Sequence, residues 1–78
     1  MLNKGGENLY RNLAAELARA GLKTGEVSNY MGISRQCFND KKMGKTSWTL
    51  GQMELIQDLI NEKLNAEYTL DYLFKKGD

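Results

Sequence analysis

Apolar residues recur at intervals of three and four along most of the chain, which is the spacing of helices and not the alternation of strands. The first such stripe consists of Leu9, Leu13 and Leu17, and Glu16 is among the polar residues on the opposite side. Gly21 follows the stripe, and a glycine suits the left-handed position that ends many helices. The pattern predicts an amphipathic helix of about 13 residues that ends at Gly21.

A second, short helix is predicted from about Thr24 to Met31, ending at Gly32. Its start has two possible N-cap residues. One is Thr24, whose hydroxyl can accept a bond from a first-turn N–H. The other is Lys23, which would place Glu26 at the third helical position. The side chains expected to face inward are Val27, Tyr30 and Met31.

The third predicted helix begins after Ser34, a strong N-cap residue. Ile33 precedes this cap and can pack on Phe38, in the hydrophobic staple that fixes the start of a helix. The helix is expected to reach residues 42–43, and Gly44 closes it.

The fourth predicted helix has the strongest start signal in the chain. Thr49 and Gln52 form a T-x-x-Q capping box, and Trp48 can pack on Met53. Trp48 is therefore expected to anchor the core. The residues expected to face inward along this helix are Leu50, Met53, Ile56, either Leu59 or Ile60, and Leu64.

A last short helix is predicted after Thr69. Its Leu73 and Phe74 can either close the core of the monomer or form the surface of a homodimer, and the pattern leaves both open. The chain has 78 residues, which suits one domain with one core. The expected fold is all-α, a compact bundle of about five short helices in a single domain 1–78, with a core over about 8–74 and flexible ends.

Composition limits the chemistry that this chain can perform. Cys37 is the only cysteine and there is no histidine, so an internal disulfide and the usual zinc or iron sites are excluded. The commonest general base is missing as well, so we do not expect an enzyme. We expect no cofactor, no metal and no small-molecule ligand. Short apolar runs and the lack of a signal-peptide pattern favour a cytoplasmic protein that does not enter membranes.

Charge is distributed unevenly, although the net charge is only +1. Residues 23–45 carry five positive and two negative side chains, whereas residues 46–78 carry three positive and six negative ones. The middle of the chain is therefore basic and its last third is acidic. Such an asymmetry favours a one-sided electrostatic contact, although scatter among small numbers explains it equally well.

The two short helices in the basic segment have the residue pattern of a helix-turn-helix. Ser28 is small and lets a second helix cross closely, while Gly32 permits the backbone of a tight turn. Apolar Val27, Ile33 and Phe38 can fill the wedge between the helices. The second helix of such a pair can enter the major groove of DNA.

On these residues the chain resembles the Cro and lambda-repressor-like helix-turn-helix family, also called the XRE family. The segment from Leu22 to Lys45 carries most of the resemblance. The segments Leu13–Leu22 and Leu70–Phe74 are similar to the first and last helices of small phage-encoded members. The resemblance implies a sequence-specific regulator of transcription, Cro- or repressor-like and encoded by a phage or prophage, that binds double-stranded DNA.

The resemblance also implies which residues contact DNA. Ser34, Arg35 and Gln36 match the start of the recognition helix, with Asn39 and Asp40 one turn later. Arg35 can pair with guanine, and Gln36 or Asn39 with adenine, each through two hydrogen bonds. Asp40 can accept a bond from cytosine or repel phosphate. The residues expected near the phosphate backbone are Lys23, Thr24, Lys41, Lys42 and Lys45.

Three positions depart from the family pattern. The family usually has Gln where this chain has Thr24, and Glu or a similar residue where it has Gly25. It commonly has an aliphatic residue in place of Lys41, which can bury its stem and keep its charge wet.

An alternative function is a protein-interaction module on the same helical fold, such as an antirepressor or host-takeover factor. The low net charge, Asp40 and the missing Gln favour it. In that case Arg35, Gln36 and Asn39 form an ordinary solvated helix face. If the DNA hypothesis holds, tight binding calls for a homodimer on half-sites about 34 Å apart. Cys37 is expected to be a half-buried packing residue.

Overall fold

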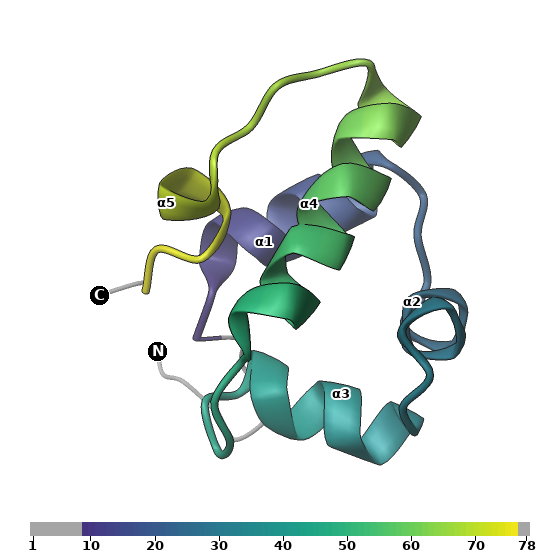
Figure 1. Cartoon of the computed structure of the whole chain (residues 1–78), viewed down its shortest axis with the longest axis vertical. Helices are drawn as coiled ribbons and strands as arrows, with labels where there is room; N and C mark the ends of the chain where they lie inside the picture. Colours follow the sequence, from purple (N-terminus) through teal and green to yellow (C-terminus); the bar gives the residue numbers. More distant parts are fainter. Residues whose placement is uncertain (1–8, 77–78) are drawn as a thin grey trace.

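Five α-helices make up residues 9–76, the part of the chain that the computed structural model describes (Figure 1). They are α1 (Arg11–Arg19), α2 (Thr24–Met31), α3 (Arg35–Lys42), α4 (Leu50–Leu64) and α5 (Leu70–Leu73). These residues contain no strand, so the prediction of a compact all-α bundle is confirmed. The predicted flexible ends fall largely on residues 1–8 and 77–78, which lie outside the described residues.

The helices pack around one core. α1 packs against α4 and α5, α4 also packs against α5, and α2 packs against both α3 and α4. In Figure 1, α4 crosses in front of α1, and α5 lies to the side of both. α2 is seen almost end-on while α3 is seen from the side, so these two helices cross steeply.

An aromatic cluster occupies the core where α3, the loop before α4 and the last helix meet. The Trp48 ring lies 5.7 Å from Phe38, 6.3 Å from Tyr10 and 5.4 Å from Phe74 between centroids, each in an edge-to-face arrangement. Such pairs add a favourable quadrupole term to the burial of the rings. Trp48 and Phe38 are both buried, so the predicted role of Trp48 as a core anchor is confirmed.

The helix starts agree closely with the capping signals. In α4, the Thr49 hydroxyl accepts from the Gln52 N–H at 3.1 Å, and the Gln52 side chain accepts from the Thr49 N–H at 3.0 Å. In α3, the Ser34 hydroxyl accepts from the Cys37 N–H at 3.0 Å. The capping box of α4 and the Ser34 cap of α3 are thus both confirmed.

Two open alternatives at the helix ends are resolved. Lys23, not Thr24, is the N-cap of α2, and its N–H donates to the Glu26 carboxylate at 3.0 Å. Leu73 is fully buried, and Phe74 packs on the core beside it. The last helix therefore closes the core of the monomer.

The first helix is shorter than predicted. It has 9 residues, because the backbone of Tyr10 is not helical and Leu9 turns away. The Leu9 N–H donates instead to the Lys42 carbonyl at 2.9 Å, at the end of α3. The predicted end is correct, since Gly21 has a φ of +71° directly after the helix.

Several predicted side-chain positions are wrong. Tyr30 and Leu50 were expected inside but are 52% and 59% exposed. The other residues predicted to face inward do so. Val27, Ile56 and Ile60 are buried, and the residues that pack against the core are Met31, Met53, Leu59 and Leu64. Leu50 is the first residue of α4, and it is Trp48 before it and Met53 after it that pack into the core.

Glu16 is also misplaced by the prediction, which put it on the polar face of α1. It is only 2% exposed. The Tyr72 hydroxyl from α5 donates to its Oε2 at 2.8 Å, and the Arg19 Nε lies 3.4 Å from its Oε1. A carboxylate can be buried in this way because it is paired and hydrogen-bonded.

Candidate nucleic-acid interface

α2 and α3 are joined by a three-residue turn that directs α3 across the end of the bundle (Figure 1). Gly32 ends α2 with a φ of +76°, a left-handed backbone that glycine adopts without a steric penalty. The Ile33 N–H then donates to the Ser28 carbonyl at 3.0 Å. This bond closes the turn, and Ser34 caps the next helix. The local sequence thus fixes the orientation of α3 relative to α2.

α3 has an inner and an outer side. Phe38 and Lys41 are its buried residues and attach it to the core. Ser34, Arg35 and Gln36 are exposed at its N-terminal end. Of the other two residues predicted to face bases, Asn39 and Asp40, each is half-buried one turn later. The structure therefore brings the five predicted residues onto one helix, with the first three most accessible.

Gln36 and Asp40 are hydrogen-bonded to each other. The Gln36 Nε2 donates to the Asp40 Oδ1 at 2.9 Å. A glutamine amide has two N–H donors and an acceptor oxygen. Pairing with adenine needs one donor and the oxygen, so it is compatible with this bond. Asp40 can thus hold the Gln36 side chain in place.

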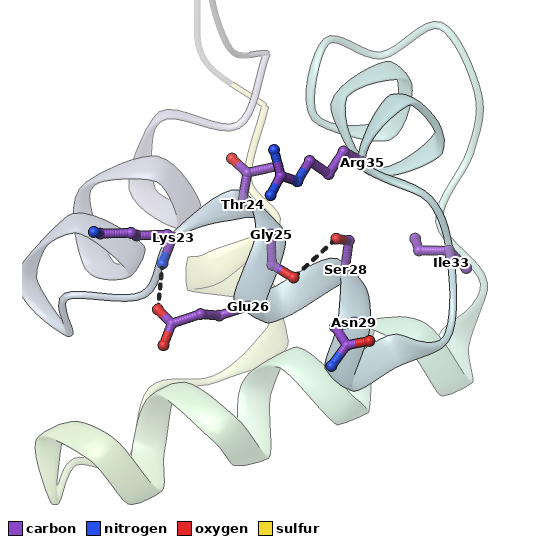
Figure 2. Close-up of a pocket in the computed structure, with 8 residues that line it drawn as sticks. All are labelled: Lys23, Thr24, Gly25, Glu26, Ser28, Asn29, Ile33 and Arg35. Carbon is purple, nitrogen blue, oxygen red and sulfur yellow. Dashed lines mark hydrogen bonds between the residues drawn. The ribbon is translucent and has the colours of Figure 1, made fainter.

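Arg35 does not extend away from α3 but folds back over the first turn of α2. Figure 2 shows its guanidinium beside Thr24 and Gly25. A Cβ atom placed on Gly25 would lie 2.9 Å from the Arg35 Nη2 and 3.0 Å from its Nε. At this point α2 and α3 therefore contact each other through the Arg35 side chain, which lies against the backbone of Gly25.

The three lysines near the end of α3 have different surroundings. Lys41 was predicted to contact phosphate, yet it is only 8% exposed and its Nζ donates to the Ser47 carbonyl at 2.8 Å. It ties α3 to the following loop, and in this conformation it is not accessible to a phosphate. Lys42 is half-buried with its Nζ 5.4 Å from the centre of the Phe38 ring, and burial lowers the pKa of its ammonium group. Lys45 is exposed.

The start of α2 lies beside the N-terminal end of α3. Lys23 is exposed and Thr24 is half-buried. Together with Arg35 they line an open hollow of about 800 Å³, which Figure 2 shows in close-up. The full lining consists of Lys23, Thr24, Gly25, Glu26, Ser28, Asn29, Ile33 and Arg35. Three of the residues predicted to contact DNA are thus brought together in this hollow.

The role of Gly25 was not recognised from the sequence, where the residue stood only as a departure from a family pattern. A signal for it exists. Glycine is a poor helix former, and Gly25 occupies the second position of a helix where no positive φ is needed. A glycine of that kind can permit a close approach to its backbone, as at Gly25, but Gly51 at the same position of α4 has open space beside it.

Neither a metal site nor a membrane-spanning helix is found within residues 9–76. Cys37 is half-buried, as expected for a packing residue. Within residues 9–76, no three His, Cys, Asp or Glu side chains gather as a metal site requires. No helix in this range has the length and apolar character needed to cross a membrane.

Comparison with known proteins yields no match to any family model, curated protein or solved structure.

Proposed function

We propose that this protein is a sequence-specific regulator of transcription that binds double-stranded DNA by inserting α3 into the major groove. The observation that carries the proposal is the position of α3. Its buried Phe38 fixes the helix on the core, while Ser34, Arg35 and Gln36 stand exposed at its free end. A helix held in this way at a tight turn suits the width of the major groove.

The charges around α3 support the same proposal. Lys23 and Arg35, which line the same hollow, are exposed, and so is Lys45 shortly after the end of α3. Cationic side chains beside an inserted helix neutralise phosphates and fix its register on the duplex. Gln36 and Asn39 then contact base edges, where a glutamine or asparagine amide discriminates adenine.

The resemblance to Cro-like regulators extends the proposal to a biological role. We propose that the protein is a Cro- or repressor-like regulator encoded by a phage or prophage. One such module makes a small interface with DNA, so we propose that it binds as a homodimer.

Selection of bound duplexes from a random pool tests the proposal. We expect one motif to be enriched, with two half-sites about 34 Å apart if the protein binds as a dimer. Recovery of the input pool without enrichment would contradict sequence-specific binding.

α4 favours a second candidate, an interaction module that binds another protein. Its outer side carries exposed Glu54, Asp58 and Glu62 in one row, next to the exposed Leu50 and Leu55. An acidic surface with apolar residues is unsuited to DNA and suits a basic protein partner. This candidate becomes the better one if the protein binds neither random nor selected duplexes.

A further inference from the structure

Gly25 has a conformation that does not require glycine. The glycines with positive φ in the described part of the chain are Gly21, Gly32 and Gly44, and Gly25 is not among them. A glycine near a helix start also costs stability relative to alanine. The relevant property of Gly25 is therefore the space that the absence of a side chain leaves beside its backbone.

The space beside Gly25 is filled by Arg35. A Cβ on Gly25 would meet three atoms of the guanidinium group, Nη2 at 2.9 Å, Nε at 3.0 Å and Cζ at 3.2 Å. All three distances are shorter than an ordinary van der Waals contact. A larger residue at position 25 would therefore require the guanidinium, which is the flexible end of an exposed side chain, to shift from this position.

Gly51 provides a matched comparison. It occupies the second position of α4, as Gly25 does in α2, but a Cβ there would meet nothing within 4 Å. The close approach is thus a property of the α2–α3 junction and not of glycines at this helical position.

The absence of a side chain on Gly25 permits this direction of the Arg35 side chain. Its guanidinium points back toward the start of α2, beside Thr24, whereas the Lys23 side chain, which also lines the hollow, extends away from Arg35 (Figure 2). Glu26 also lines the hollow, but one of its carboxylate oxygens accepts from the Lys23 backbone N–H. The side chains around the hollow thus include two cations and one carboxylate.

We infer that Arg35 binds a backbone phosphate of DNA in this hollow, together with Lys23 and Thr24, and that Gly25 is the positioning residue that permits it. The inference rests on the proposed DNA-binding function. A guanidinium presents two parallel N–H donors to a phosphate, and it keeps that ability when it lies flat on backbone. The guanine contact expected from the sequence requires the side chain to extend along the groove instead.

The experiment compares two substitutions at this junction with one control. The wild type, Arg35→Ala, Gly25→Ala and the double variant are titrated with the selected duplex and with random duplex at several salt concentrations. Gly51→Ala, which makes the same change where there is room, is the control. Denaturant unfolding followed by Trp48 fluorescence verifies that each variant is folded.

A phosphate contact gives a distinct set of results. Arg35→Ala weakens binding to both duplexes by the same factor, about threefold to tenfold, and reduces the slope of log affinity against log salt by about 0.9. Gly25→Ala also weakens both, and adds little in the Arg35→Ala background because the two changes remove the same contact. Gly51→Ala leaves binding unchanged.

Other results overturn the inference and leave the proposed function standing. If Arg35→Ala loses affinity only for the selected duplex and keeps the salt slope of the wild type, Arg35 contacts a base and not a phosphate. If Gly25→Ala and Gly51→Ala bind both duplexes with equal affinity, Gly25 does not position Arg35. If the wild type binds neither duplex, the proposed function itself fails and the inference falls with it.

Discussion

Glu16 and Lys41 are ionisable side chains buried inside a very small protein. Each is tolerated because the structure supplies a partner: the Tyr72 hydroxyl at 2.8 Å for Glu16, and the Ser47 carbonyl at 2.8 Å for Lys41. A buried charge without such a bond would destabilise the fold by several kcal/mol, or about half of a small domain's stability. These two contacts join α1 to α5 and α3 to the loop before α4.

Tyr72 makes the stability of the protein sensitive to alkaline pH. Its hydrogen bond to Glu16, aided by burial and by the charge of Glu16, raises the pKa of the Tyr72 hydroxyl above its ordinary value of 10.0. The contribution is present below that value and is lost as pH rises through the raised pKa of the folded state. We expect the stability advantage of the wild type over Tyr72→Phe to be constant from about pH 7 to about pH 9 and to shrink as pH rises above about 10.

Denaturant unfolding of the two proteins across this pH range measures the effect. Because other groups titrate equally in both, the difference between the curves isolates Tyr72. A difference that stays constant with pH would show that the hydroxyl is not bound to Glu16.

Lys41 and Lys45 are predicted to differ in their effect on DNA binding. Lys45→Met removes an exposed cation and should reduce the slope of log affinity against log salt by about 0.9. Lys41→Met removes a cation whose Nζ is bonded to Ser47, so the slope should not change. The two substitutions are chemically identical and lie four residues apart, so each is the control for the other. Equal slopes for the two variants would contradict the assigned position of Lys41.

At the scale of the helices, the sequence predicted well those features, such as helix caps, that depend only on residues close together in the chain. Ser34, Thr49 and Gln52 act on groups three residues away, and each cap forms as expected. Glu16 and Lys41 were misplaced because their positions depend on how separate elements pack, through Tyr72 for Glu16 and through Ser47 in the loop before α4 for Lys41. Tyr72 is 56 residues from Glu16 in the chain, and no local sequence pattern predicts their contact.

The same limit applies to the candidate site. The turn between α2 and α3 and the exposed end of α3 follow from Gly32, Ser34 and Phe38. The direction of the Arg35 side chain does not follow from these residues, because it depends on how closely α2 and α3 cross. Only the structure relates Arg35 to Gly25, which is ten residues earlier in the chain.

The capping box of α4 should carry a measurable share of stability. Thr49→Ala leaves the Gln52 N–H without its acceptor, and we expect a loss of about 1 kcal/mol in the free energy of unfolding. Thr46→Ala, at an exposed position three residues earlier, is the control and should stay within about 0.5 kcal/mol of the wild type. Denaturant unfolding followed by far-UV circular dichroism compares them, and equal losses would mean that α4 does not depend on its cap.

At the scale of the whole molecule, the core and the candidate interface share a residue. Phe38 packs edge-to-face against Trp48 in the core and lies on the helix that we propose enters DNA. Lys23, Arg35 and Lys45 are exposed in the segment 23–45, while the exposed carboxylates of α4 lie on another element. Other exposed cations lie outside that segment, at Arg11, Arg19, Lys63, Lys75 and Lys76. A net charge of +1 is therefore compatible with a cationic surface on one side.

The salt dependence of binding to random duplex DNA tests the central claim most directly, because it requires no knowledge of a target sequence. With Lys23, Arg35 and Lys45 exposed on the proposed DNA-facing side, log affinity should fall linearly with log salt, with a slope of about −2.7 per bound monomer. A slope near zero, or no binding at protein concentrations of about 10⁻⁴ M, would contradict DNA binding.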